Sequence, residues 1–286
     1  MIVFRSSRRS FLQHGLAGIA ALFTGRVRAQ ETNTVPAPPG TDYAAIVARM
    51  MAALPFERVT VPGQLALAEY DRLQTAGRGL PVVVGGDEDL ERLAEQFSIG
   101  DTAVFGSAVA GLEARQPDEI LALADTIAFP DGSRDWVDAL RHAAAVSATE
   151  DWPASLAPDA PGLTVASDVL SGRPLEQVHI LLIPAEHSWQ IPAYLRWGGW
   201  NTCPAPEYHV AALRRWHDLY GAEVVGMSGD VINLRVRRPP QDRAAAVALA
   251  CEQYAYCPDF VDQGTGTITA LGAGLINSDW WFFWWD

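Results

Sequence analysis

A short polar stretch in the second half of the chain carries the first side chains that suit chemistry. Glu186, His187, Ser188 and Trp189 directly follow the apolar run Val178–Ile183. A carboxylate and an imidazole supply an acid and a base, and the indole supplies an apolar wall. If the apolar run is a strand, this loop lies at its carboxyl end, where sites of α/β proteins gather. The alternative is an ordinary polar loop that contains one histidine.

Cys203 and His209 form a second candidate pair near the start of an expected helix. A thiol beside an imidazole is the arrangement of a cysteine nucleophile and its base, but the sequence shows no third group that would orient the imidazole. His217 lies eight residues after His209, too far for the i, i+4 histidine pair that binds metal on one helix face. His217 falls in the apolar stripe of that helix, so we expect it to be a hydrogen-bonded core residue.

The loop that follows Cys257 is the third candidate. Asp259, Asp262 and Gln263 supply oxygen atoms of the kind that bind divalent cations. The same residue types also build ordinary turns. The next residues, Gly264 to Thr267, open a helix without a preceding strand and lack the third glycine of a dinucleotide site. We therefore expect Thr267 to be a helix N-cap.

Gly85-Gly86 also stands between an expected strand and a helix, where backbone amides bind anions. Asp87, Glu88 and Asp89 then fill the first turn with negative charge, which repels phosphate and stabilises the helix itself. We interpret this segment as structural, with an Asp87-capped helix.

The turn Trp197-Gly198-Gly199-Trp200-Asn201 is the best candidate for ligand binding. Glycines let a partner approach the backbone, and two indoles provide flat apolar walls with one donor each. The alternative is a packed aromatic corner beneath the last strand of the chain.

Several chemistries are excluded or unsupported by residue types. The chain contains no lysine, which excludes Schiff-base cofactors, Walker-type phosphate loops and Ser-Lys nucleophile pairs. It also lacks the Gly-x-Ser-x-Gly, His-Glu-x-x-His and Cys-x-x-Cys motifs. The sequence identifies no metal, cofactor or partner.

The N-terminus resembles a twin-arginine export signal. Arg8-Arg9 precedes the apolar residue Phe11, and a weakly apolar stretch covers Gly15 to Phe23. That stretch is about half of the roughly 20 residues of a membrane span, so we expect cleavage after Ala29 and no stable membrane span. The predicted location is the periplasm or the extracellular space. The alternative is an amphipathic N-terminal helix.

Charge narrows the choice of partner. The chain has a net charge of −13, and five of its 21 basic residues but none of its 34 acidic ones precede the expected cleavage site. Nucleic acid and anionic membranes are therefore poor partners. An odd number of cysteines, Cys203, Cys251 and Cys257, allows a Cys203–Cys257 disulfide with one free thiol, or three buried reduced cysteines.

Apolar periodicity and breakers divide the chain into five parts: a signal peptide (1–29), a linker (30–40), an N-terminal α/β lobe (41–150), a second linker (151–162) and a C-terminal domain (163–286). In the N-terminal lobe we expect a βαβα unit. The expected elements are helices at 43–54, 64–74, 87–97, 118–127 and 133–148 and strands at 57–61 and 81–84.

In the C-terminal domain we expect a mixed sheet with flanking helices, which makes the fold class α+β. The expected elements are strands at 178–183, 222–227, 231–236 and 280–286 and helices at 206–220, 242–256 and 267–276. This order resembles a split βαβ arrangement. The last strand alternates aromatic residues on both faces, which predicts a position inside a sheet covered on both sides.

The C-terminal domain contains the motifs Leu182-Ile183-Pro184, Pro192 to Asn201, Cys203-Pro204, Gln253 to Asp259 and the terminal Trp-Phe-Phe-Trp-Trp-Asp. In these motifs it resembles the bacterial domain of unknown function 4253 family over Leu163–Asp286. This family has no established activity, so the resemblance implies no catalytic residue. The twin-arginine leader differs from the mostly leaderless members and argues against a cytoplasmic role.

Three functional hypotheses follow. The first is an exported, non-catalytic binding or interaction domain that uses the segments Trp197–Cys203 and Cys257–Asp262. The second is an exported hydrolytic or metal-dependent enzyme. The enzyme requires one cleft that gathers Glu186, His187, Cys203, His209, Asp259 and Asp262. A role in folding stability without any ligand is the third.

Overall fold

The computed structural model describes residues 43–105, 114–131, 134–154 and 162–286. The expected signal peptide, the first linker and residues 155–161 of the second linker lie outside the described part. Among the described residues, no helix is both long and apolar enough to cross a membrane.

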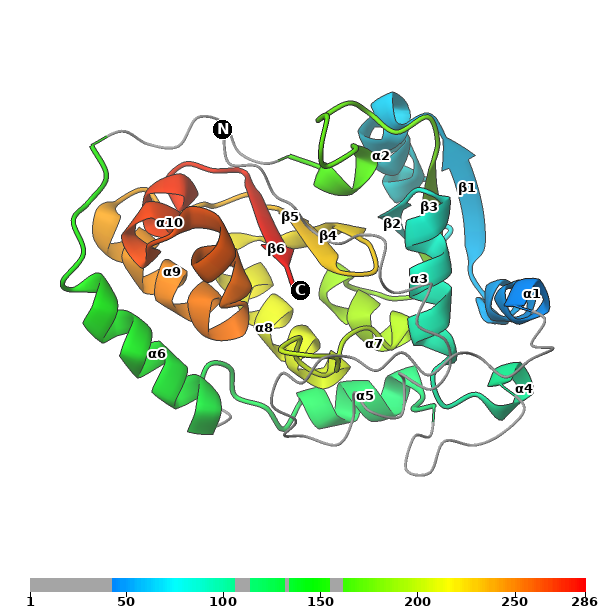
Figure 1. Ribbon diagram of the computed structural model, residues 1–286, viewed down its shortest axis with the longest axis horizontal. Helices are drawn as coiled ribbons and strands as arrows, with labels where there is room; N and C mark the ends of the chain where they lie inside the picture. The colour runs from blue at the N-terminus through cyan, green and yellow to red at the C-terminus, as the bar shows by residue number, and fades with distance from the viewer. Residues whose placement is uncertain (1–42, 106–113, 132–133, 155–161) are drawn as a thin grey trace.

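The strands of the described residues form one mixed sheet of six, in the order β1-β3-β2-β4-β5-β6 (Figure 1). Their bounds are β1 (Glu57–Val61), β2 (Leu80–Gly85), β3 (Val178–Ile183), β4 (Glu223–Met227), β5 (Val231–Arg235) and β6 (Trp280–Trp284). The pair β2 and β4 is parallel, and the other neighbours are antiparallel. The predicted α+β class with a mixed sheet is confirmed.

Strands from the two expected lobes alternate within this sheet. β3, from the C-terminal part, lies between β1 and β2 and is antiparallel to both. β1 and β2 are therefore parallel, and with α2 (Ala66–Ala76) they form a split βαβ unit around β3. The predicted split βαβ within the C-terminal domain is wrong, because β3 and β4 run in opposite directions. Local sequence does not encode which distant strand inserts between two others.

Most expected helices are present within a few residues of their predicted bounds. They are α1 (Tyr43–Ala53), α2, α3 (Asp87–Ser98), α5 (Pro117–Ala124), α6 (Arg134–Ser147), α8 (Pro206–Tyr220), α9 (Arg243–Tyr256) and α10 (Ile268–Leu275). Several short elements were not predicted: the helices α4 (Thr102–Phe105) and α7 (Ile191–Leu195), the 3-10 turns η2 (Gly63–Leu65), η3 (Thr164–Ala166) and η4 (Ser188–Gln190), and the π-helix η5 (Phe260–Thr265). They are too short to show a period of their own.

Helix ends follow the capping residues. The Thr267 side chain caps α10, as predicted. The Asp242 side chain caps α9, and Gly221 ends α8 in a left-handed conformation. The predicted cap of α3 is wrong: Gly86 is the N-cap, and the Asp89 carboxylate accepts a hydrogen bond from its backbone N–H. The acidic first turn therefore stabilises its own helix, as expected.

The two faces of the sheet are covered unequally. On one face, a large apolar core joins the sheet to α3, α7, α8, α9 and α10. On the other face, a smaller core joins it to α2 and η3. In Figure 1, α9 and α10 lie at the β6 end of the sheet, and α1 and α3 lie toward the β1 end.

The terminal strand β6 lies at the edge of the sheet, so its predicted interior position is wrong. Trp281, Phe283 and Trp285 are buried in the larger core, whereas Trp280, Phe282 and Trp284 are half-buried on the other face. Local segments protect the open edge in place of another strand. The carbonyls of Trp280 and Trp284 accept hydrogen bonds from Ser278 Oγ and Cys257 Sγ, and the Phe260 ring lies 5.7 Å from Phe282. Such capping shields an edge strand from unwanted pairing.

Candidate functional site

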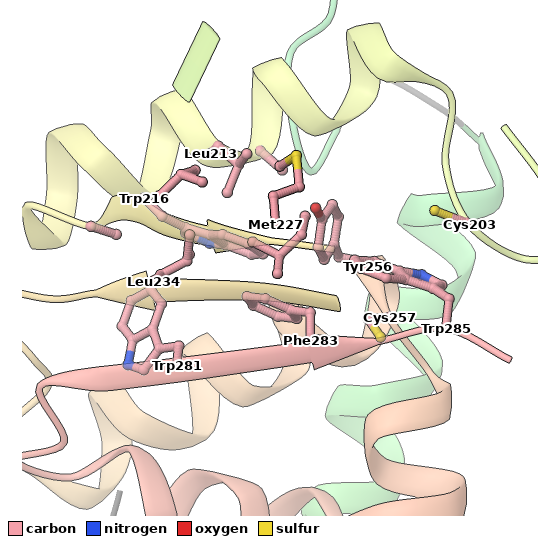
Figure 2. Packing of buried hydrophobic residues seen from close by; sticks show 14 of the residues in the cluster. Cys203, Leu213, Trp216, Met227, Leu234, Tyr256, Cys257, Trp281, Phe283 and Trp285 are labelled. Atoms are coloured by element: carbon pink, nitrogen blue, oxygen red, sulfur yellow. The ribbon is translucent and has the colours of Figure 1, made fainter. Parts of the chain in front are cut away.

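The C-terminal candidate residues surround a buried cluster of rings. Trp216 on α8 stacks on Phe283 of β6 with ring centres 5.3 Å apart. Tyr256, at the end of α9, contacts both Phe283 and Trp285 at 5.2 and 5.3 Å. Figure 2 shows these rings between α8 and β6, with Cys203 and Cys257 at the same end of the cluster. The tryptophan-rich C-terminus is therefore mainly core, in which aromatic pairs add to the energy of burial.

Cys203 and His209 do meet in the structure, as their pairing predicted. Cys203 Sγ lies 3.4 Å from His209 Nε2. A third group that was not apparent from the sequence, the Tyr256 hydroxyl, lies 2.5 Å from His209 Nδ1. All three side chains are buried. The arrangement thus contains the three parts of an activated nucleophile in contact with one another.

The direction of the hydrogen bonds argues against nucleophilic catalysis. The imidazole of His209 also donates to the Pro204 carbonyl, and that carbonyl lies on the same side of the loop as Nε2. The tautomer that satisfies every partner has the proton on Nε2, while Nδ1 accepts from Tyr256. The nitrogen facing Cys203 is therefore a donor and cannot accept the thiol proton.

Burial keeps the same groups uncharged. Desolvation lowers the pKa of His209 to about 3, and the hydrogen bond to Pro204 opposes this only in part. Desolvation also raises the pKa of the Cys203 thiol well above its usual range and raises that of Cys257 to about 12. A reactive cysteine requires a thiolate in an electropositive, partly exposed setting. We conclude that this cluster is a neutral element of the core.

The three cysteines are free and buried. The expected Cys203–Cys257 disulfide is therefore not formed, and the alternative of three reduced, buried cysteines is the one that the structure shows. Cys251 lies 3.7 Å from the Ser147 hydroxyl, and Cys257 donates to the Trp284 carbonyl. Each of these two thiols thus has a polar partner within the core.

Gly198 permits the tight turn that closes this cluster. Its φ is +112°, and an added Cβ would lie 2.2 Å from the Pro204 carbonyl oxygen and 2.6 Å from His209 Nε2. No side chain fits there. The glycine therefore serves the close approach of the protein's own loop and imidazole, which supports the packed-corner alternative.

The side chains of this turn divide between core and surface. Trp197 is fully buried, and its indole N–H donates to the Ser228 carbonyl at 2.7 Å. It cannot serve as a wall for a ligand. Trp200 is half-buried with its ring 4.8 Å from that of Trp197, and Asn201 is exposed and donates to the Asp286 carbonyl.

The predicted oxygen ligands lie next to this turn. Asp259 accepts hydrogen bonds from Thr202, from the backbone N–H of Asp286 and from Gln263. Asp262 is exposed and faces Tyr254. In the described part of the chain, no group of three or more His, Cys, Asp or Glu side chains is arranged to hold a metal ion. Asp259 instead fastens the end of β6 to neighbouring loops.

Glu186 and His187 are in a different place. His187 is exposed, stacks on Trp189 and has its ring centre 6.1 Å from that of His217. His217 lies two turns along α8 from His209, about 12 Å at 1.5 Å per residue. The six residues proposed for one catalytic cleft are therefore divided between two locations. His217 is half-buried rather than a core residue, because it sits in the last turn of α8.

A series of hydrogen bonds that was not predicted from the sequence connects β1, β3 and α3. Thr60 Oγ1 lies 3.0 Å from His179 Nδ1, and His179 Nε2 lies 2.7 Å from Asp87 Oδ1. The hydrogen bond from His179, with help from Gln177, lowers the pKa of Asp87. His179 is the one polar residue in the apolar run of β3, which is the signal that could have identified it.

Thr60, His179 and Asp87 are hydrogen-bonded in the order hydroxyl, imidazole, carboxylate, as in a hydrolase triad. Their burial differs from that of a triad. The Asp87 side chain is 67% exposed and the imidazole 6% exposed, whereas a triad carboxylate is buried to orient its histidine. Thr60 and His179 are also directly opposite residues of the antiparallel β1–β3 pair. We interpret these hydrogen bonds as structural: they connect the edge strand β1, through His179 of β3, to α3.

No curated protein and no solved structure gives a significant match to this chain. A family model does match, over residues 179–286, beginning at His179 rather than at Leu163. The C-terminal part of the chain thus matches DUF4253, a domain of unknown function, which confirms the resemblance.

Proposed function

We propose that the chain is an exported, non-catalytic binding domain that recognises a basic segment of another protein. One observation carries the proposal. In the C-terminal domain, the cysteine thiols and the His209 imidazole are buried and neutral, while carboxylates and half-buried rings reach the surface together. We call this surface the C-terminal face, and it consists of Trp200, Asn201, Asp259, Phe260, Asp262, Gln263 and Asp286.

The face combines negative charge with aromatic edges. The backbone N–H of Asp286 donates to the Asp259 carboxylate, and Phe260 packs against β6 beside them. Guanidinium and ammonium groups are attracted both by carboxylates and by ring faces. The overall charge of −13 favours encounter with a basic partner over longer distances.

The proposal predicts measurable binding of a cationic peptide. We expect a fluorescein-labelled, arginine-rich peptide to bind the mature protein at low salt, with an anisotropy change that decreases as salt screens the charges. Asp262→Asn and Trp200→Ala should each weaken binding by a factor of about three or more, because each removes a charge or a ring from the face.

Asp138→Asn is the matched control, because Asp138 is an exposed acid on α6. It should leave the dissociation constant within about twofold of wild type. Failure to bind the peptide, or equal loss in the control and in Asp262→Asn, would refute the C-terminal face as the binding surface. Circular dichroism of each variant confirms that the fold is intact.

Export is a separate part of the proposal and rests on the leader. Replacing Arg8 and Arg9 with lysine should keep the protein in the cytoplasm of a bacterial host, because the paired arginines are the recognised feature of this signal. Fractionation and mass measurement of the wild-type protein should find a periplasmic form that begins after Ala29. Wild-type protein that stays cytoplasmic at full length would contradict the export proposal and leave the peptide-binding result intact.

A further inference from the structure

Two histidines from distant parts of the sequence come together on the surface, away from the C-terminal face. His187 follows β3 and immediately precedes η4, and His217 lies in the last turn of α8. Their ring centres are 6.1 Å apart, with planes inclined by 53°. His187 is exposed and His217 is half-buried, so solvent and ions reach the pair.

The hydrogen bond between His217 and Ala222 fixes the tautomer of the His217 ring and so decides which nitrogen can bind a metal ion. Nδ1 lies 3.2 Å from the carbonyl oxygen of Ala222. A carbonyl only accepts, so Nδ1 carries the proton and the lone pair is on Nε2. Histidines that bind metals are held in the same way, by donating the other ring N–H to a carbonyl or a carboxylate.

The position of His187 is fixed by its neighbours. Its backbone N–H donates to the side-chain oxygen of Gln190 at 3.0 Å. Its ring lies nearly parallel to Trp189, at 11° and 5.2 Å, and Arg214 lies over that indole at 5.5 Å. These contacts place the imidazole beside His217, and its exposure leaves the side chain free to rotate.

The spacing of the rings suits a shared ion. A Zn–N bond is about 2.1 Å long and a ring nitrogen lies about 1 Å from its ring centre, so imidazoles that share one ion have centres up to about 6 Å apart. The observed 6.1 Å corresponds to a wide N–metal–N angle. A small rotation of the exposed His187 side chain reduces this angle toward the tetrahedral value.

We propose that His187 and His217 form a surface site for a borderline-soft divalent cation such as Zn²⁺. Imidazole nitrogens prefer Zn²⁺, Cu²⁺ and Ni²⁺ to Mg²⁺ or Ca²⁺. Within the described ranges of the chain, no larger group of His, Cys, Asp and Glu is arranged to hold a metal. The protein thus supplies two ligands, and water or a donor from another molecule completes the coordination.

Isothermal titration of the tag-free mature protein with ZnCl₂ tests the site. We expect about one equivalent of Zn²⁺ to bind, and no heat from MgCl₂. His187→Ala and His217→Gln should each weaken Zn²⁺ binding by at least about tenfold, because a single imidazole remains. His187 is exposed and His217 is half-buried, so circular dichroism should show that both variants keep the fold.

His142→Ala is the matched control, because His142 is an exposed histidine on α6 that lies beside Tyr254. It should bind Zn²⁺ as wild type does. The site is refuted if wild type shows no binding, or if either pair variant retains wild-type affinity. Loss of binding in His142→Ala together with normal binding in the pair variants would place the ion on α6 instead.

Discussion

Helix α8 carries two histidines, eight residues apart, that the fold places in opposite environments. His209, in the first half of the helix, is fully buried among Trp197, Tyr256 and Trp285. His217, in the last turn, is half-buried and faces the exposed ring of His187. The same residue type on one helix therefore serves the core at one end and offers a ligand at the other.

His209 and His217 differ in whether a ring nitrogen remains available to bind a ligand. At His209, both ring nitrogens are used inside the core, and burial keeps the ring neutral by lowering its pKa to about 3. At His217, Nδ1 donates to the Ala222 carbonyl, which leaves the lone pair on Nε2, and the ring centre lies 6.1 Å from that of His187. Contact between a histidine and a cysteine is thus weaker evidence of function than an open nitrogen at the surface.

The largest effect should come from filling the turn above His209. Gly198→Ala places a Cβ 2.2 Å from the Pro204 carbonyl oxygen and 2.6 Å from His209 Nε2. Because the clash involves backbone and a buried ring, we expect the free energy of unfolding to fall by at least about 3 kcal/mol. Urea denaturation of the two proteins measures the change.

Gly199→Ala is the control for backbone strain alone. Gly199 also has a positive φ, +89°, but the nearest atom to an added Cβ is 3.9 Å away. We expect a loss of about 1 to 2 kcal/mol, the cost of a left-handed alanine. Equal losses at the two positions would mean that the buried imidazole does not pack against the turn as described.

A smaller effect should appear in the pH dependence of the free energy of unfolding, because His209 is buried as a neutral imidazole. Its pKa is about 3 in the folded protein and about 6.5 in an unfolded chain. Between about pH 3 and pH 6.5, the imidazole is therefore protonated in the unfolded state but neutral in the folded state. The stabilisation that His209 provides is complete above pH 6.5 and decreases by up to about 1.4 kcal/mol per pH unit as the pH falls toward 3.

Comparison of wild type with His209→Gln isolates this contribution. The advantage of wild type in urea denaturation should shrink between pH 6.5 and pH 4.5, as the linkage requires. Val210→Ala, a buried change on the same helix without a titrating group, should differ from wild type by a constant amount. A constant difference for His209→Gln as well would contradict the lowered pKa of His209.

Much of the local structure was predictable because it depends on neighbours in the sequence. The apolar run of β3, the bounds 206–220 of α8 and the Thr267 cap of α10 all agree with the prediction. Capping and periodicity act over a few residues, so they leave a direct record in the sequence. The chain order of the elements was predictable for the same reason.

The site was predictable only in part. The proximity of Cys203 to His209 followed from their spacing, but Tyr256 belongs to another helix, and its contact with His209 depends on how α8 and α9 pack. The pairing of His187 with His217 likewise joins a strand end to a helix end across 30 positions of sequence. Neither contact has a local signal, because side chains from separate elements meet only when those elements pack.

Residue types alone determined several properties of this protein. The absence of lysine, the excess of acid and the aromatic C-terminus define the chemistry that is available, since they do not depend on conformation. Tertiary structure decided how those residues are used. It inserted β3 between β1 and β2, placed β6 at an edge and buried His209 while leaving His187 exposed. Strand neighbours and burial are set by the competition among all segments for the apolar core, which no short stretch of sequence contains.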